Sequence, residues 1–571
     1  MTNISAPPLL LRKRRPAEPL AGYITPKLRE LVARLSHIND FGFLTMVWST
    51  HALQTGRKDS IRKGIFRYPK EAASDSILEG HSVQAWEIET LANLLLTTPK
   101  TPGFAWEPTM DTRDFETIRV LTNLLRSAED DETPLRINNE NIIDELHRIG
   151  HRQFPWQRTW VRSGELYKYL YIYCQGVCAD YFKEKYGLDI IDYVSAAFVL
   201  FTQHVGRTWM PLLDTQEELP VSLEAIHKTT KLLSSSTSTA HREAAALVKK
   251  FEAEASAPIP IAYQPSYLRL NPIIRYDRAD TTLYTSPLPD LILLRVTAGL
   301  FYDLASGKNA VISDANTRFE EYSRKIIKAF IPEFDPLPAE RYRYKKNPVE
   351  TPDILLKLDS KIVSVMECKA TKLTYAAQYG ENPREDASDG YDQIVKAIFQ
   401  LWRYFAHVRQ GILKHNVADD VTGVILTLDS WTQMGGKLRD KLVAEAKVYS
   451  VNKDSSITEA DMRTPVFCPI QELDDILSVS DANQILATFR RMTDIDSFSW
   501  NVRQKRDDIG PRLPAKPYPF DPGELMPLWA ITNRGRWSDQ PLKDSGEHGL
   551  YQNRLPYTDA TAPSIVGRPK R

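Results

Sequence analysis

The sequence predicts an α/β core, with a central mixed sheet flanked by helices, preceded by a large and mainly α-helical N-terminal region. Three observations predict this arrangement. Apolar residues recur at helical spacing through much of residues 24–227. Two short apolar runs separated by a turn indicate a β-hairpin in residues 353–369. Beyond the hairpin, helical and strand-like patterns alternate, which is the element order of a sheet covered by helices.

The composition is that of a soluble protein with several domains. A length of 571 residues predicts two to four domains, and 42% hydrophobic with 26% charged residues is ordinary. The 73 basic and 73 acidic residues cancel, which excludes a globally basic nucleic-acid coat protein but allows a local basic patch. Four dispersed cysteines are too few for a disulfide framework, and no apolar run approaches the length of a membrane helix. We therefore expect a cytoplasmic protein with no membrane partner.

Composition and pattern divide the chain into five parts. The clearest break is the low-complexity run Ser234–Thr239, where we expect a boundary or a large loop. At the start, the basic run Arg12–Arg15 follows the apolar Leu9–Leu11, the wrong order for a secretory signal. A solvated tail is the preferred interpretation of this run, and an arm on nucleic acid is the alternative. The parts are a basic flexible arm (1–22), a mainly helical domain (23–232), a linker helix with a Pro-punctuated mixed region (233–305), the α/β core (306–480) and a Pro-rich C-terminal extension (481–571).

Three segments of the N-terminal region have clear helical patterns: 26–35, 86–96 and 166–186. Aromatic residues at helical spacing in the third segment are typical of a helix that faces a core. Cys174 and Cys178 lie one helical turn apart there. Because no second pair of ligands follows nearby, buried core thiols are favoured over a metal site.

Two amphipathic helices bracket the hairpin. The first spans residues 318–330, and its apolar stripe consists of Phe319, Tyr322, Ile326 and Phe330. The second spans residues 391–405, and its apolar stripe consists of Ile394, Ile398, Leu401, Trp402 and Phe405. At about 100° per residue, the opposite side of the second helix carries polar residues, namely Gln393, Lys396, Gln400, Arg403, Tyr404 and His407.

The hairpin brings acidic side chains together. Alternation along residues 362–369 places Glu367 and Lys369 on one face, with Val363 and Val365. Residues 359–361 have turn composition, so Asp353 lies near the open end of the hairpin, opposite Glu367. The two carboxylates can therefore converge.

Converging carboxylates with a nearby lysine predict metal-assisted chemistry on a phosphodiester. Two carboxylates resist joint ionisation unless a cation lies between them, and Mg²⁺ prefers such oxygen ligands. The cation would be bound by Asp353 and Glu367, with the carbonyl oxygen of Cys368 as a further candidate ligand. Lys369 supplies a positive charge beside the attacking water or the phosphate.

These residues resemble the PD-(D/E)xK nuclease superfamily, which includes type II restriction enzymes and RecB-like nucleases. The motif here is Pro352-Asp353, then thirteen residues, then Glu367-Cys368-Lys369. The resemblance covers a quarter to a third of the chain. It implies a restriction-endonuclease-like core, catalysis by Asp353, Glu367 and Lys369, and Mg²⁺ as cofactor, with Mn²⁺ able to substitute.

The resemblance adds three candidates outside the hairpin. The family core begins with a helix that often carries a Phe-Glu pair, and Glu320 matches that glutamate, with Glu321 as the alternate. RecB-like members carry Gln-x-x-x-Tyr after the core strands, and Gln400 and Tyr404 match that spacing. A solvated helix face is the alternative for both pairs. Here an insertion before Gln400 departs from the family pattern, because residues 378–386 have loop composition.

The remaining pattern completes the expected core. Residues 421–428 and 447–451 are predicted strands, joined by a helix around residues 438–446. The sequence Glu445-Ala446-Lys447 repeats the acid-x-Lys letters, but its surroundings predict a helix. In the C-terminal extension, Trp529, Arg534, Arg536 and Trp537 have the residue types that stack on bases. An ordered extension that packs on the core is the preferred interpretation.

The sequence thus predicts a Mg²⁺-dependent nuclease that hydrolyses phosphodiester bonds, with DNA preferred over RNA as partner. Restriction or prokaryotic anti-phage defence follows from family analogy alone. A partner protein or a homodimer stays open. The alternative is a non-catalytic nucleic-acid-binding or assembly subunit with an inactive nuclease-like domain, which would bind no metal at Asp353 and Glu367.

Overall fold

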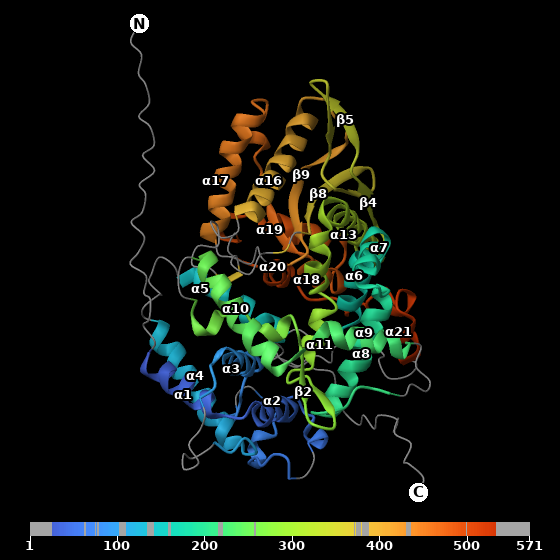
Figure 1. Cartoon of the computed structure of the whole chain (residues 1–571). Helices are drawn as coiled ribbons and strands as arrows, with labels where there is room; N and C mark the ends of the chain where they lie inside the picture. Colours follow the sequence, from blue (N-terminus) through green and yellow to red (C-terminus); the bar gives the residue numbers. More distant parts are fainter. Residues whose placement is uncertain are drawn as a thin grey trace.

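The structure is a computed structural model (Figure 1). It describes residues 25–532 except 62–63, 75, 77–78, 102–109, 134–141, 158–161, 215–220, 256–258, 371, 373–377, 380–387, 430–435 and 498–499. The basic N-terminal arm (1–22) lies outside the described residues, as do Arg534, Arg536 and Trp537.

The N-terminal region is helical, as the periodicity predicts. Its helices are α1 (Pro26–His37), α2 (Asp40–Gln54), α3 (Ala85–Thr97), α4 (Phe115–Glu132), α5 (Ile142–Gln157), α6 (Ser163–Tyr173), α7 (Gly176–Tyr186), α8 (Ile190–Gly206), α9 (Leu223–Leu233) and α10 (Thr237–Ala255). The predicted helix 166–186 is two helices, because the chain breaks at Cys174 and enters α7 through Gly176 at φ +54°. Both Cys174 and Cys178 are buried free thiols.

The serine run does not form the expected large loop. Ser234–Ser236 is a short strand, β1, that pairs in parallel with β2 (Ile273–Asp277). Strand β3 (Thr282–Thr285) pairs antiparallel to β2. The backbone of the serines gains sheet hydrogen bonds from β2, and this long-range pairing is invisible in local composition.

The central sheet is mixed and five-stranded, in the order β10-β9-β8-β7-β4. Strand β4 pairs antiparallel with β7 and β7 antiparallel with β8, whereas β8, β9 and β10 are parallel. The bounds are β4 (Phe334–Pro338), β7 (Ile354–Leu358), β8 (Lys361–Lys369), β9 (Val417–Thr427) and β10 (Val466–Pro469). The predicted hairpin, which β7 and β8 form, is confirmed, and residues 421–427 of the predicted strand 421–428 lie in β9.

The predicted strand at 447–451 is wrong. These residues belong to helix α17 (Gly436–Lys453), which also contains Glu445-Ala446-Lys447. Val448 and Val451 are 65% and 64% exposed, so these β-branched residues do not belong to a buried strand. The fifth strand of the sheet is β10 instead, whose residues are all buried.

Helices cover both faces of the sheet. Helix α13 (Lys308–Phe330) and the helical N-terminal region share one apolar core with Ile354, Leu356 and Met366. Helix α16 (Ser388–Arg409) packs on the opposite face, against Leu355 and Val365. The predicted apolar stripes of both helices are buried. In Figure 1, α16 and α17 lie side by side at one end of the molecule and α1 to α4 lie at the other.

The remaining elements surround this core. The helices are α11 (Asp290–Arg295), α12 (Leu300–Leu304), α18 (Ile470–Ser478), α19 (Ala482–Met492), α20 (Val502–Ile509) and α21 (Pro527–Thr532). A separate hairpin consists of β5 (Arg341–Tyr344) and β6 (Asn347–Glu350). Short 3₁₀ helices are η1 (Lys58–Ser60), η2 (Lys70–Ala72), η4 (Ile261–Tyr263), η5 (Tyr267–Arg269), η6 (Ala305–Gly307), η7 (Glu459–Asp461), η8 (Ile495–Ser497) and η9 (Pro522–Glu524).

The C-terminal extension packs on the core as far as it is described. The ring of Phe520 stacks on Tyr167 of α6 at 4.9 Å between centroids, and Trp529 is buried. Lys516 donates hydrogen bonds to the carbonyl oxygens of Phe330 and Ser480. In the part of the chain that the structure describes, no single helix is long and apolar enough to cross a membrane. Helices α7 and α8 are long and apolar enough only when taken together, and a 72° bend separates them.

Candidate active site

The hairpin of β7 and β8 places Asp353 directly opposite Glu367. Ile354 pairs with Met366, and continuing the antiparallel register by one residue brings the two acids face to face. The Oδ2 atom of Asp353 accepts a hydrogen bond from the backbone N–H of Cys368 at 2.7 Å. Lys369 donates from Nζ to Oε1 of Glu367 at 2.9 Å. The three side chains therefore lie at the same end of the hairpin, where the charges of Asp353 and Lys369 both act on Glu367.

Local chain geometry holds Asp353 in this position. Thr351 donates its backbone N–H to the carbonyl oxygen of Glu340 at 3.0 Å, and its hydroxyl accepts from the N–H of Glu340 at 2.9 Å. Pro352 follows and is buried. A proline fixes its own φ and favours extended backbone in the residue before it. The entry to β7 is therefore rigid on the side from which the aspartate projects.

Glu367 is a buried carboxylate with unused bonding capacity. It is 1% exposed, and its Oε2 atom has no hydrogen-bond partner in the described structure. Burial raises the pKa of Glu367 to about 7, although the charge of Lys369 opposes this shift and that of Asp353 adds to it. A buried, unpaired carboxylate oxygen is costly unless something positive binds it.

Glu320 of α13 belongs to the same electrostatic group. Burial is the largest cause that raises the pKa of Glu320 to about 8. The charges of Asp353 and Glu367 contribute to this shift, and the charge of Arg324 opposes it. The pKa of Asp353 is also raised, chiefly by burial. Three carboxyl groups that cannot all ionise together without a cation are thus gathered around the open end of the hairpin, as the sequence predicts for Glu320.

The donor set fits a hard divalent cation bound by few protein ligands. Among the described residues, no group of three or more His, Cys, Asp and Glu side chains is arranged to hold a metal ion. Mg²⁺ is nevertheless often bound through one or two carboxylates while it keeps several waters. Asp353 and Glu367 supply two carboxylates, and the unpartnered Oε2 of Glu367 offers a free ligand atom. The thiol of Cys368 is buried with a strongly raised pKa, so only its backbone carbonyl is a candidate ligand.

Tyr404 makes its hydrogen bond outside this group. The Tyr404 hydroxyl shares a hydrogen bond with Nδ1 of His415 at 3.0 Å, and its ring is buried. Gln400 is half-buried on α16, with no hydrogen bond to Asp353, Glu367 or Lys369 in the described structure. The prediction that Tyr404 and His407 lie on a polar, exposed side of α16 is therefore wrong. Tyr404 and His407 are interior residues, because the β5–β6 hairpin covers this end of the helix and Tyr342 bonds to His407 at 2.7 Å.

Two further residues approach the carboxylates without belonging to the motif. Arg403 of α16 donates to the carbonyl oxygen of Glu350 at 3.2 Å, and its charge lowers the pKa of Glu367. The negative charge of Glu350 contributes to the raised pKa of Asp353. The sequence pattern places Arg403 on the polar side of its helix, but only the packing of α16 against β6 directs it to the site.

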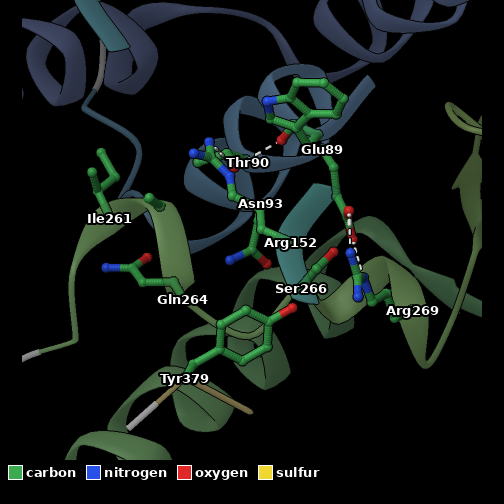
Figure 2. Close-up of a pocket in the computed structure, with 11 residues that line it drawn as sticks. Glu89, Thr90, Asn93, Arg152, Ile261, Gln264, Ser266, Arg269 and Tyr379 are labelled. Carbon is green, nitrogen blue, oxygen red and sulfur yellow. Dashed lines mark hydrogen bonds and ion pairs between the residues drawn. The ribbon is translucent and has the colours of Figure 1, made fainter. Parts of the chain in front are cut away.

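A pocket lies away from these residues, between α3, α5, residues 261–269 and Tyr379 (Figure 2). The predicted catalytic residues do not line it. Its arginines are already paired. Arg152 contacts Glu129 at 2.6 Å, and Arg269 contacts Glu89 at 2.6 Å. Tyr379 belongs to the expected insertion after β8 and donates its hydroxyl to the carbonyl oxygen of His151 at 3.1 Å; residues 380–386 lie outside the described residues.

Comparison of the chain with protein-family models, with curated proteins and with solved structures finds no match. The arguments about function therefore depend on the residues and the geometry of the site.

Proposed function

We propose that the protein is a metal-dependent nuclease that hydrolyses the phosphodiester bonds of DNA. The observation that carries this proposal is the register of β7 and β8, which sets Asp353 opposite Glu367 with Lys369 hydrogen-bonded to Glu367. Glu320 adds a third carboxyl group with a raised pKa. Clustered acids with perturbed pKa values are typical of catalytic sites.

The residues have separable roles in this proposal. Asp353 and Glu367 would hold Mg²⁺ or Mn²⁺, with the carbonyl oxygen of Cys368 as a further ligand. When bound, such a cation lowers the pKa of a coordinated water and stabilises charge on the phosphate. Lys369 presents Nζ as a hydrogen-bond donor to the attacking water or to a phosphate oxygen. Glu320, with a pKa of about 8, carries a proton at neutral pH and can exchange it with water in the site.

The biological setting follows from family analogy alone. Family analogy suggests restriction or anti-phage defence in a prokaryotic cytoplasm, with the helical N-terminal half recognising a substrate or a partner. Cleavage of both strands of a duplex would favour a homodimer, because one such site cuts one strand.

A cleavage assay tests the proposal. Supercoiled plasmid, linear duplex, single-stranded DNA and RNA are incubated with the full chain in Mg²⁺, Mn²⁺ or EDTA. We expect metal-dependent cutting of DNA that falls by at least about a hundredfold in Lys369→Ala, the lower range for loss of one electrostatic stabiliser. The matched control is Lys447→Ala, which changes the exposed lysine of the helical Glu-Ala-Lys sequence in α17. Equal cutting by Lys369→Ala and wild type contradicts the proposal.

Calorimetry separates an inactive subunit from a nuclease that needs an activator. If neither protein cuts, Mg²⁺ or Mn²⁺ is titrated into wild type and into Asp353→Asn. Heat of binding that is present only in wild type supports a nuclease awaiting an activator. Its absence from both supports the non-catalytic subunit.

A further inference from the structure

The hairpin of β5 and β6 projects a row of basic side chains. It immediately precedes Pro352-Asp353, and residues 341–350 contain four cations and one acid in a chain with no net charge. Tyr342 and Tyr344 of β5 are half-buried and anchor the hairpin to the core. Tyr342 bonds to His407 at 2.7 Å, and the Tyr344 hydroxyl donates to Asp454 at 3.2 Å. The alternate residues of β5 and the turn are exposed, namely Arg341, Arg343, Lys345 and Lys346.

Only part of this charge is neutralised. Arg341 contacts Glu350 at 2.7 Å, and Lys345 approaches Asp454 at 3.7 Å. Arg343 and Lys346 have no ion pair within the described residues and both are exposed. An anchored hairpin therefore presents two unpaired cations, together with a third that is 65% exposed.

The turn of the hairpin is occupied by residues that do not suit its geometry. Tyr344 pairs with Asn347, so Lys345 and Lys346 form a two-residue turn, with φ of +47° and +70°. Such turns favour Asn-Gly or another pair that tolerates positive φ, and lysine rarely adopts it. Unfavourable backbone retained in a protein points to a functional constraint. An Asn-Gly turn would suit this geometry but would remove the positive charges of Lys345 and Lys346.

The base of the hairpin adjoins the candidate active site. Glu350 ends β6 three residues before Asp353, and its carbonyl oxygen accepts from Arg403, whose charge acts on Glu367. Strands rise about 3.3 Å per residue, so four residues carry the tip roughly 13 Å from this base. Figure 1 shows β5 at the end of the molecule opposite α1 to α4, where it extends beyond the central sheet.

We propose that the β5–β6 hairpin is a DNA-binding ribbon that holds duplex DNA across the Asp353–Glu367 site, with Arg343, Lys345 and Lys346 contacting phosphates. The major groove of B-DNA is about 12 Å wide and admits a two-stranded ribbon. The major groove of A-form RNA is too narrow for side chains to enter, which makes duplex DNA the favoured partner. The role in cleavage rests on the proposed nuclease function, whereas the binding itself does not require it.

Fluorescence anisotropy in EDTA tests binding without cleavage, using a short labelled DNA duplex and an RNA duplex of the same sequence. The test variant is Arg343→Gln/Lys346→Gln. The matched control, Arg29→Gln/Lys249→Gln, removes two exposed charges from α1 and α10. Each phosphate contact contributes about 0.9 to the slope of log affinity against log salt. We expect the test variant to lower that slope by about 1.8 and the affinity for duplex DNA by at least about tenfold near 0.1 M salt, with the control unchanged.

A second variant separates the effect of lost charge from an effect of lost stability. Lys345→Asn/Lys346→Gly removes two charges while supplying the preferred turn residues. We expect its melting temperature to equal or exceed that of wild type while its affinity for duplex DNA falls.

Three outcomes overturn the proposal: unchanged affinity in both hairpin variants, an equal loss in the Arg29/Lys249 control, or RNA binding that equals DNA binding and falls with it. A protein that binds duplex DNA through the hairpin, but neither cuts it nor gives heat of Mg²⁺ or Mn²⁺ binding, overturns the nuclease function alone.

Discussion

Glu320, Asp353 and Glu367 are three acids that the folded chain holds together at a free-energy cost. Each has a raised pKa with burial as the largest cause, and the negative charge of Asp353 also raises the pKa of Glu320 and of Glu367. For a buried group such as Glu367, a shift from 4.5 to about 7 corresponds to roughly 3 kcal/mol of stability lost at high pH. Stability given up at a cluster of this kind is common where function requires it.

Glu320→Gln should change the pH dependence of stability. Glu320 has an ordinary pKa of 4.5 in the unfolded chain and about 8 in the folded one, so between these values only the folded state keeps the proton. Stability contributed by this group therefore falls as pH rises through that window. Because glutamine resembles the protonated acid, we expect the variant to match wild type near pH 5 and to exceed it in stability near pH 8.5.

Denaturant unfolding in EDTA at the two pH values measures this effect. The control is Glu321→Gln, which changes the neighbouring acid on α13, half-buried beside the Tyr171 hydroxyl. A stability difference between Glu320→Gln and wild type that does not vary with pH would show that Glu320 does not share the field of the two strand acids.

The acids and Lys369 are predictable from the sequence because their arrangement depends on short-range rules. Alternation along β8 and the turn at Asp359–Ser360 fix which side chains meet. The approach of Arg403 is different. It depends on how α16 packs over β6, two elements whose relative position no local pattern encodes. The same packing explains why Tyr404, matched by spacing alone, bonds to His415 instead.

At the level of elements, amphipathic helices were easier to predict than short strands. The apolar stripes of α13 and α16 repeat over several turns, so many residues support each helix prediction. Strand β10 has only four residues and is recognised as a strand because β9 lies beside it. Residues 447–451 have strand-like composition, yet they continue α17, where Tyr449 packs on Phe399.

Ile398→Ala should weaken the α/β core through the face that α16 covers. Ile398 is fully buried in the cluster that joins α16 to β7 and β8. Removing its side chain loses apolar burial and leaves a cavity, which typically costs about 2–5 kcal/mol. Denaturant unfolding measures the change, and Lys396→Ala, an exposed substitution two residues earlier on the same helix, should alter stability by less than about 0.5 kcal/mol. Equal effects of the two substitutions would mean that α16 is not firmly packed on the sheet.

The whole molecule has an apolar core that crosses the expected domain boundary. Residues of α6, α7 and α8 share one buried cluster with α13 and with the underside of β7 and β8. Lys325 of α13 lies over the rings of Tyr167, Tyr171 and Phe520, which come from the helical region and the C-terminal extension. The α/β core is therefore covered on the α13 face by residues far away in the sequence.

The isolated segment 306–480 should not fold as a stable monomer. Without α6 to α8 and Phe520, the outer face of α13 would expose apolar surface that the full chain buries. We expect this fragment to aggregate or to melt far below the full chain, whereas the full chain unfolds in one cooperative transition. Size-exclusion chromatography and thermal melts of both proteins check this. A monomeric fragment with the melting temperature of the full chain would show that the core is autonomous.

The tethering of Tyr379 has a mechanical consequence. Its hydroxyl is held by the carbonyl oxygen of His151 in α5, and its ring stacks on Tyr263, so the chain leaving Lys369 is fastened to the helical half a short distance later. A partner that bound and shifted α5 would displace Tyr379, ten residues after Lys369 in the chain. The helical half is therefore positioned so that a partner bound there can change the alignment of the candidate active site.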